Sequence, residues 1–166
     1  ANHPLYGCTF YGDSGWAVGA SGFVFRTTNA GSTWNTALFA GGNTYYACSF
    51  PNGSHGWVVG QNSSNGSVIL KTTDSGINWS TQINGTYSRL QSCNFLNDYY
   101  GWAAGRNGTI IYTTNGGTSW SQQDAGTSGI IESLFFLEQD CGTYSGNGVM
   151  AGYFYPEEAG EGHHVE

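Results

Sequence analysis

The chain has 166 residues, a formal net charge of -7, and only four lysine and arginine residues in total. Nucleic-acid binding relies on these cations, so nucleic acid is excluded as an expected partner. No apolar stretch approaches the roughly 20 residues needed to span a bilayer, so membrane insertion is not expected either. With 27 glycines and 16% aromatic residues, the chain reads as short apolar runs between glycine-rich turns, which predicts an all-β protein.

Three short sequence elements recur in a fixed order along the chain. The first is Cys-x-Phe, at Cys8–Phe10, Cys48–Phe50 and Cys93–Phe95. The second is Gly-Trp-x-x-Gly, at Gly15–Gly19, Gly56–Gly60 and Gly101–Gly105. The third runs from a threonine pair to a tryptophan, at Thr27–Trp34, Thr72–Trp79 and Thr113–Trp120. Repeats with periods of about 40 to 50 residues are typical of propeller-like arrays.

The repeat divides one domain, residues 1–166, into modules at about 5–43, 44–88, 89–129 and 130–166. Each full module is predicted to hold four antiparallel strands, placed in the second module at 45–50, 56–60, 67–73 and 79–83. This is the strand number of a β-propeller blade. The fourth module is degenerate, because Thr143 stands where the other modules have tryptophan and no third element follows. The fold class is therefore all-β, with three full blades and one degenerate blade.

The third element predicts a tight turn. Its Asn or Asp side chain accepts hydrogen bonds from backbone N–H groups two residues on, its glycine supplies a positive φ, and its tryptophan covers the turn. The predicted structural turn residues are Asn29, Gly31, Trp34, Asp74, Gly76, Trp79, Asn115, Gly117 and Trp120.

This element resembles the Asp-box, or bacterial neuraminidase repeat, with the pattern S/T-x-D/N-x-G-x-x-W. The complete module resembles the repeat of the photosystem II stability and assembly factor family, over residues 5–127 and more weakly over 130–150. Related repeats occur in xyloglucan-active glycoside hydrolases and sortilin-type receptors. In these families the box is a fold element, so the resemblance implies a β-propeller and leaves function to be argued from the site.

No catalytic centre, metal site or cofactor site is predicted. A sialidase needs three clustered arginines, whereas Arg26 occupies a repeat position shared with Lys71 and Tyr112. A glycoside hydrolase needs two carboxylates about 5–10 Å apart, whereas Asp13 and Asp98 occupy the same turn of different modules and read as polar turn residues. Trp16, Trp57 and Trp102 are open to two readings, sugar-stacking platforms or packing between blades.

The cysteines and sequons suggest an oxidising compartment. Cys8, Cys48 and Cys93 share one repeat position. The sequence is compatible with two alternatives, a Cys93–Cys141 disulfide or free thiols throughout. Such cysteines in a lysine-poor chain favour a secreted or cell-surface location, extracellular or periplasmic. N-glycosylation is possible where the chain enters a eukaryotic secretory route. The sequon asparagines are Asn52, Asn62, Asn65, Asn78, Asn84 and Asn107.

These observations predict a non-enzymatic propeller module that acts as a structural, assembly or protein-binding scaffold and self-associates through unpaired strand edges. The alternative is a carbohydrate-binding, lectin-like module. Less favoured readings are a glycoside hydrolase fragment and a photosystem assembly factor, since that family relies on basic residues and this chain is acidic. Repeat insertions tend to fall on one binding face. The residues expected on that ligand or partner face are Asn43, Gln61, Asn62, Asn65, Asn97 and Arg106.

Overall fold

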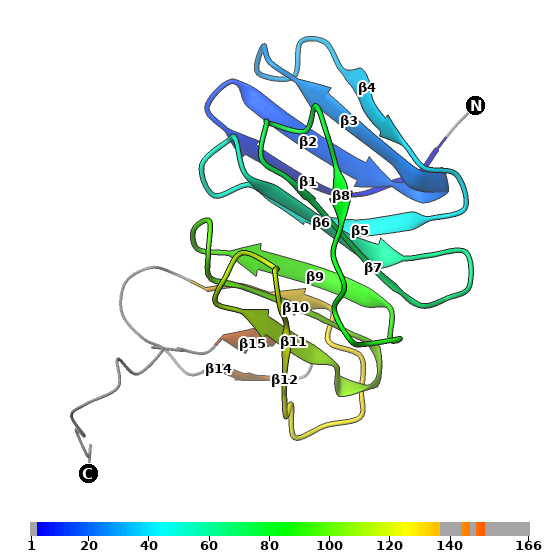
Figure 1. The fold of residues 1–166 in the computed structure, drawn as a ribbon, viewed down its shortest axis with the longest axis vertical. Coiled ribbons are helices and arrows are strands. Elements are labelled where there is room, and N and C mark those ends of the chain that lie inside the picture. Colours follow the sequence, from blue (N-terminus) through cyan, green and yellow to red (C-terminus); the bar gives the residue numbers. More distant parts are fainter. Residues whose placement is uncertain (1–2, 137–143, 147–148, 152–166) are drawn as a thin grey trace, which may run out of the picture.

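The computed structural model describes residues 3–136, 144–146 and 149–151, which form a series of β-sheets (Figure 1). The first sheet consists of β1 (Leu5–Tyr11), β2 (Ser14–Gly19), β3 (Phe23–Thr27) and β4 (Asn35–Phe39). The second consists of β5 (Thr44–Ser49), β6 (Gly56–Gln61), β7 (Ser67–Thr72) and β8 (Ser80–Thr81). The third consists of β9 (Leu90–Phe95), β10 (Gly101–Gly105), β11 (Ile110–Thr113) and β12 (Ser121–Gln123).

Each of these three sheets is antiparallel, with its strands adjacent in chain order. We call them blades 1, 2 and 3. Short 3-10 turns, η1 (Ala20–Gly22) and η2 (Arg106–Gly108), join the second and third strands of blades 1 and 3. The predicted fold class and the four-strand modules are confirmed.

The fourth sheet differs from the blades before it. It contains β13 (Ser133–Leu134), β14 (Tyr144–Gly146) and β15 (Val149–Ala151), in the order β13-β15-β14. The pairing of β13 with β15 is parallel, so this sheet departs from the antiparallel order predicted for a blade. The sequence here lacks both the Gly-Trp element and the Asp-box, which are the elements that fix strand order in the other blades.

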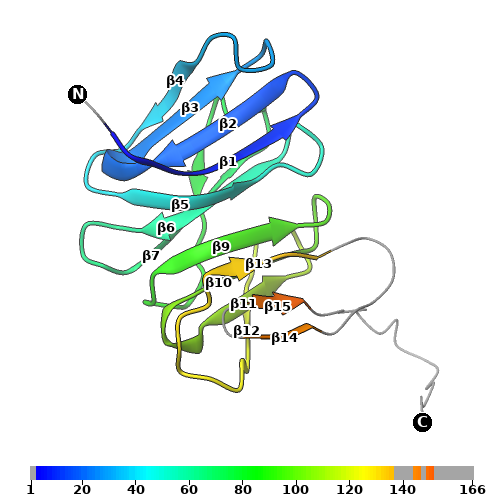
Figure 2. The ribbon, with the colours of Figure 1, turned by 180° about the vertical axis from the view of Figure 1, so that it is seen from behind.

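The first strands of the sheets lie side by side. Strands β1, β5, β9 and β13 follow one another down the molecule, and β4, β8 and β12 lie at the far edges of their sheets (Figure 2). Blade 1 and the fourth sheet lie at opposite ends of this series (Figures 1 and 2). The described residues therefore form an open array of propeller blades.

The two glycines of each Gly-Trp-x-x-Gly element are required by close packing. A Cβ on Gly56 would overlap the ring of Phe50, and a Cβ on Gly60 would overlap the carbonyl oxygen of Thr44. The corresponding glycines of β2 and β10 meet the same obstacles. These glycines let the second strand lie close against the first strand and its phenylalanine, while the intervening Trp57 is fully buried.

The tryptophans of this element join neighbouring blades. Trp16 of blade 1 stacks on Phe50 of blade 2, with ring centroids 3.6 Å apart and an interplanar angle of 6°. Phe50 in turn meets Trp79 of the blade 2 box edge to face, at 6.1 Å and 84°. The next interface repeats this order with Trp57, Phe95 and Trp120, and Trp102 stacks on Phe136 at 4.4 Å.

The core consists of three apolar clusters, one between each pair of successive sheets. The Gly-Trp tryptophans belong to this buried material, so they pack between blades and do not offer platforms for sugars. Hydrogen bonds also cross the interfaces: Phe95 N donates to Ser49 Oγ at 3.0 Å, and Leu134 N donates to Ser92 Oγ at 2.9 Å. Each blade is thus held by the one before it.

Candidate binding surface

Each Asp-box is a hydrogen-bonded turn between the third and fourth strands of its blade. In blade 2, Asp74 Oδ1 accepts from Asn78 N at 2.8 Å, and Asp74 Oδ2 accepts from Asn78 Nδ2 at 2.7 Å. Thr72 Oγ1 accepts from Gly76 N at 2.9 Å, and Gly76 has φ +86°. Trp79 Nε1 donates to Gly76 O at 3.0 Å. The same side chain to backbone bonds recur around Asn29 and Asn115.

The acceptor geometry corrects one detail of the sequence analysis. The Asn or Asp side chain accepts the N–H four residues on, and the N–H two residues after the threonine is taken by the threonine hydroxyl, as with Asp74 N and Thr72 Oγ1 at 3.3 Å. The threonine hydroxyl and the Asn or Asp side chain of the box therefore make their hydrogen bonds within the turn. The boxes are structural and are not the candidate site.

Acidification is expected to loosen the blade 2 box alone. Hydrogen bonds from the backbone and side chain of Asn78 lower the pKa of Asp74 to about 2. Because the carboxylate form is favoured in the folded state, its stabilising effect is present above about pH 4 and is lost as the pH falls towards 2. Asp74→Asn, which copies the asparagine of the other two boxes, should remove this part of the acid sensitivity. Amide hydrogen exchange of Asn78 against pH measures it, and an unchanged pH profile in the variant would contradict this assignment.

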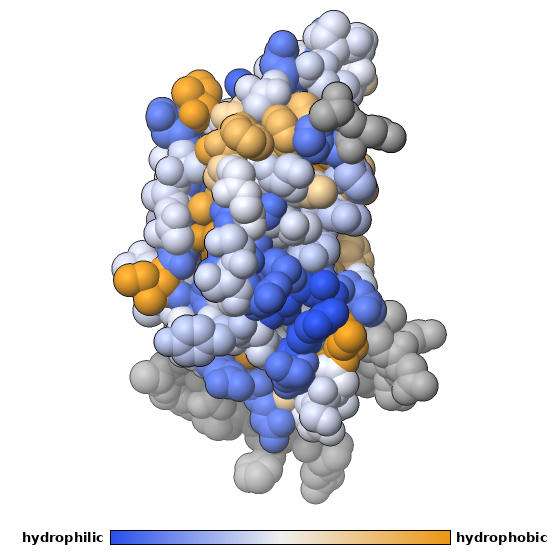
Figure 3. All heavy atoms as spheres, turned by 90° about the vertical axis from the view of Figure 1, so that its right-hand side faces the viewer, coloured by the Kyte–Doolittle hydropathy of each residue, from blue (hydrophilic) through white to orange (hydrophobic). Residues whose placement is uncertain are grey.

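The connections between strands alternate between two ends of the array. We call the end that carries the β2–β3, β4–β5, β6–β7, β8–β9 and β10–β11 connections the loop end, and the opposite end the box end (Figure 1). Of the residues predicted for the ligand or partner face, Asn97 follows β9 and lies at the box end. The others lie at the loop end, namely Asn43, Gln61, Asn62, Asn65 and Arg106. Figure 3 faces the loop end, where hydrophilic residues gather in the lower middle.

A chain of polar contacts crosses from blade 3 to blade 2 at this end. Arg89 NH1 donates to Tyr46 Oη at 3.3 Å, and the guanidinium lies over the Tyr46 ring, 4.7 Å from its centroid. Tyr46 Oη donates to Gln61 Oε1 at 3.5 Å, and Gln61 Nε2 donates to Asn65 Oδ1 at 2.9 Å. Arg106 is attached through its backbone, since its N–H donates to Arg89 O at 3.0 Å. We call these five residues the loop-end cluster.

The cluster continues along the first strands of the sheets. Tyr6 of β1 contacts the Tyr46 ring, with centroids 5.3 Å apart. Gln91 of β9 donates from Nε2 to Glu132 Oε2 at 3.1 Å, just before β13. Polar and aromatic side chains therefore line the neighbouring first strands from blade 1 to the fourth sheet.

Two residues of the cluster, Tyr46 and Arg89, were missed by the sequence analysis. The available signal was the repeat itself, since Tyr46 occupies the same position as Tyr6 on a strand otherwise built of small and apolar residues. Two of the predicted residues, Asn62 and Asn43, make local hydrogen bonds and do not join the cluster. Asn62 Oδ1 accepts from Ser64 N and Gly66 N, and Asn43 Nδ2 donates to Tyr45 Oη at 3.1 Å.

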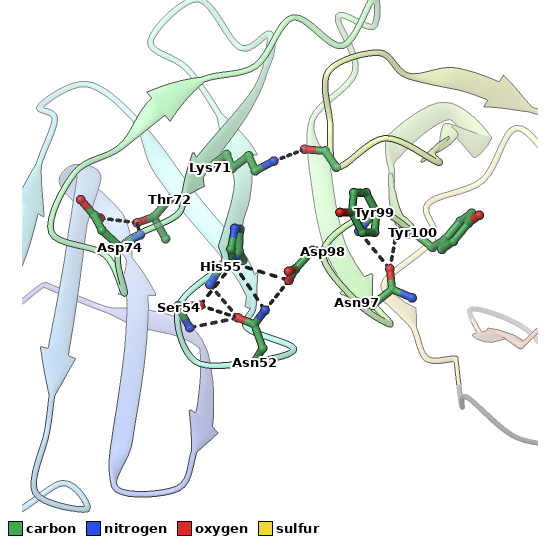
Figure 4. A network of polar contacts seen from close by, with 11 residues as sticks. Asn52, Ser54, His55, Lys71, Thr72, Asp74, Asn97, Asp98, Tyr99 and Tyr100 are labelled. Carbon is green, nitrogen blue, oxygen red and sulfur yellow. Dashed lines mark hydrogen bonds and ion pairs between the residues drawn. The ribbon is translucent and has the colours of Figure 1, made fainter.

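A second polar network lies at the box end between blades 2 and 3 (Figure 4). Asn52 Nδ2 donates to Asp98 Oδ1, and His55 Nδ1 lies 3.6 Å from the same oxygen. Lys71 Nζ donates to Gly116 O at 2.7 Å and lies over the Trp57 ring. Burial lowers the pKa of Lys71, and the Asp98 charge acts in the opposite direction. This network ties two blades together through loops.

Asn97 belongs to the same box-end loops. Its Oδ1 accepts from Tyr99 N and Tyr100 N (Figure 4), so it shapes the β9–β10 turn and does not join the loop-end residues. Within residues 3–136 and the two short strands beyond, no group of three or more histidine, cysteine or acidic side chains could hold a metal.

The described cysteines are unpaired. Cys8, Cys48 and Cys93 are free thiols. Cys141, the other half of the Cys93–Cys141 bridge considered above, lies outside the described residues, so that bridge is not tested. Burial raises the pKa of the Cys48 thiol well above its usual value and that of Cys93 to about 12. The sequon asparagines all lie on connections between strands and are at least partly exposed. No helix in the described part of the chain is long and apolar enough to span a membrane.

A family model described as photosynthesis system II assembly factor YCF48 matches residues 39–128, which is more than half of the chain. The chain belongs to this family. No curated protein matches the sequence. The YCF48 match includes every strand of blades 2 and 3, and these are the blades that carry the loop-end cluster.

Solved structures agree on the fold. A structure titled "YCF48 bound to D1 peptide" is 23% identical with a TM-score of 0.68, and the match covers 78% of this chain and 42% of that one. YCF48 from Cyanidioschyzon merolae is 25% identical with a TM-score of 0.59, covering 72% of this chain and 39% of that one. The chain thus spans about two fifths of the length of these YCF48 structures.

A glycoside hydrolase also shares the fold. The GH74 enzyme of Niastella koreensis is 16% identical with a TM-score of 0.56, and the match covers 74% of this chain and 18% of that one. An identity this low establishes the propeller fold and assigns no catalytic residue here.

The expectation of a secreted or cell-surface protein is wrong. The family and the two YCF48 structures that match this chain are those of photosystem II assembly factors. A low count of charged residues and an even number of cysteines are compatible with several compartments, so they were a poor guide to location.

Proposed function

We propose that this chain is a non-enzymatic, protein-binding part of a photosystem II assembly factor, and that it binds an extended segment of a partner protein along the loop-end cluster. The observation that carries the proposal is the row of Tyr46, Gln61, Asn65, Arg89 and Arg106, which spans two blades without a break. Family membership supports the class of partner, and the solved YCF48 complex with a D1 peptide supports a peptide as the form in which it binds.

The charge distribution favours a segment that carries a carboxylate. The chain has a net charge of -7, yet two of its three arginines, Arg89 and Arg106, are adjacent at the loop end. Arg106 is exposed. Arg89 is half-buried and donates from one guanidinium nitrogen to Tyr46 Oη, which leaves other guanidinium N–H groups for a ligand. Arginine binds carboxylates through paired, charge-assisted hydrogen bonds.

The test is binding of overlapping peptides that tile the D1 protein, measured by fluorescence anisotropy against the complete 166-residue chain. We expect one or a few peptides to bind, and Arg106→Gln to weaken binding by at least about tenfold, since one charge-assisted contact contributes roughly 1.5–3 kcal/mol. Affinity should also fall as salt is raised, because surface electrostatics are screened.

Arg26→Gln is the matched control. It removes the same charge from a side chain that lines a hollow with Gly76 and Ile77 at the box end, so D1 peptide binding should be unchanged. Equal losses in both variants would show that only net charge matters, and the loop-end assignment would be withdrawn. Absence of binding by any D1 peptide would contradict the proposed partner.

A further inference from the structure

Asparagine followed by glycine is a frequent pair in this chain, and it has a chemistry of its own. Glycine has no Cβ to crowd the asparagine side chain, so its backbone nitrogen can reach the asparagine Cγ. Attack there closes a succinimide ring and releases ammonia. Because the local sequence is the same in every pair, the surrounding structure decides which pair reacts. The pairs in the described residues begin at Asn52, Asn65, Asn84, Asn107 and Asn115.

In three of these pairs the attacking nitrogen is already engaged. It donates a hydrogen bond to a side-chain or backbone oxygen, and that bond must break before the nitrogen can attack. The glycines concerned are Gly66, Gly108 and Gly116. The N–H groups of Gly53 and Gly85, by contrast, have no hydrogen-bond partner among the described residues. The reaction is therefore open at Asn52 and Asn84.

The Asn52 carbonyl group is polarised by its neighbours. Its Oδ1 accepts hydrogen bonds from Ser54 N at 3.0 Å, His55 N at 2.8 Å and Ser54 Oγ at 3.0 Å. Two backbone N–H groups directed at one carbonyl oxygen have the arrangement of an oxyanion hole. They stabilise the negative charge that this oxygen acquires when Gly53 N attacks Cγ. Asn52 is also exposed, so water has access to the site.

The departing nitrogen of Asn52 lies beside a proton donor. Asn52 Nδ2 is 3.4 Å from His55 Nδ1 and donates to Asp98 Oδ1 (Figure 4). An amide nitrogen leaves as ammonia only if it takes up a proton, and imidazole is well suited to supply one near neutral pH. Asn84 lacks this group, since no histidine or carboxylate of the described residues contacts its amide. The complete set of reacting groups is therefore found at Asn52.

We propose that Asn52 is a site of spontaneous deamidation whose reacting groups are held in place by the box-end loops. Gly53 N bonds to Asn52 Cγ and gives up its proton to water. The Cγ–Nδ2 bond breaks, and ammonia leaves with a proton from His55, which water then replaces. A second water molecule opens the succinimide to aspartate or isoaspartate. The reaction consumes only water, and it takes place at the end of the array opposite the loop-end cluster.

The product changes the contact between two blades. Asn52 lies in the β5–β6 connection of blade 2, and Asp98 lies in the β9–β10 connection of blade 3. Deamidation replaces the Nδ2 donor that joins them with a second carboxylate. Two negative charges at this separation repel each other, so the box-end contact between blades 2 and 3 loosens as the molecule ages.

The first test compares the Asn-Gly pairs within one chain. The 166-residue protein is incubated in neutral buffer, folded and in denaturing urea, and peptide mapping by mass spectrometry follows each pair. In the folded chain, Asn52 should convert at least about tenfold faster than the three pairs with an engaged nitrogen. It should also convert no more slowly than in urea, because the fold holds the reacting groups together. Slower conversion of Asn52 in the folded chain would overturn the proposal, since the hydrogen bonds would then protect the amide.

His55→Gln tests the proton donor, because glutamine is polar but does not transfer a proton at neutral pH. Conversion of Asn52 should slow by at least about tenfold. Asn84 is the internal control, and its conversion should stay unchanged. An unchanged rate at Asn52 would remove His55 from the reaction and overturn the assigned site. The comparison of folded and denatured protein needs no variant, so it holds even where this substitution disturbs the loop.

The effect on blade 3 is tested with a matched pair of variants, Asn52→Asp and Asn52→Gln. Aspartate supplies the charge of the product, whereas glutamine keeps an uncharged amide. Amide hydrogen exchange at Tyr99 and Tyr100, which follow Asp98 in the β9–β10 connection, should be faster in Asn52→Asp than in Asn52→Gln, because exchange reports local opening. Equal exchange in the two variants would overturn the proposed loosening between the blades.

Discussion

Phe50→Ala is expected to lower the free energy of unfolding by about 3–5 kcal/mol, in the upper range for truncating a large buried side chain. Phe50 is stacked on Trp16 from blade 1 and held edge to face by Trp79 from its own blade. Its removal leaves a cavity between two aromatic rings that are fixed by other contacts, so the site cannot collapse easily. Urea denaturation measures the loss, provided that the dependence of the unfolding free energy on urea concentration is the same in the variant and the original chain.

Phe10→Ala is the matched control, because it is the same substitution at the same repeat position. Phe10 is 48% exposed and contacts Trp34 without a stacking partner on its other side, so the expected loss is about 1 kcal/mol. Phe95→Ala should behave like Phe50→Ala. Equal losses at Phe10 and Phe50 would mean that blade 1 is covered in solution and would contradict the exposure of Phe10.

The sequence predicted the blades well because each repeated element encodes a local constraint. The strands of blade 2, predicted at 45–50, 56–60 and 67–73, are found at Thr44–Ser49, Gly56–Gln61 and Ser67–Thr72. Gly60 marks where the second strand meets Thr44, and Asp74 closes its turn with bonds to residues only two to four positions away. Such short-range geometry is recoverable from residue identity.

The candidate site was predicted only in part, because it depends on contacts between blades. Gln61, Asn65 and Arg106 were expected from loop length and polarity, whereas the Arg89–Tyr46 contact joins residues 43 positions apart. Asn97 was assigned to the wrong end because loop polarity does not reveal which end a connection occupies. Antiparallel order does reveal it, since the first connection of every blade lies beside the box.

The fourth sheet shows where the repeat stops being informative. Leu134 follows Trp120 by 14 residues, the same spacing that separates Trp79 from Cys93, and it packs with Trp102 in the third core cluster. Beyond it, Thr143 replaces tryptophan and no box follows. Without these constraints the strand order β13-β15-β14, with a parallel pair, could not be predicted. Packing against blade 3 positions the start of this sheet, and no local signal specifies the rest.

Gly60→Ala is expected to destabilise the protein by at least about 3 kcal/mol, an effect reserved for steric conflict in a packed core. The added Cβ would overlap Thr44 O, which belongs to the adjoining β5 backbone and cannot rotate away. Relief requires β5 and β6 to separate, and that would also loosen the Trp57 side chain between blades 2 and 3.

Gly41→Ala is the control. Gly41 is exposed and lacks a positive φ, and its Cβ would meet only the Phe39 ring at ordinary contact distance. The thermal midpoint of this variant should therefore stay unchanged. Thermal unfolding of both variants decides the matter, and a neutral Gly60→Ala would show that the second glycine of the repeat is not required by close strand packing.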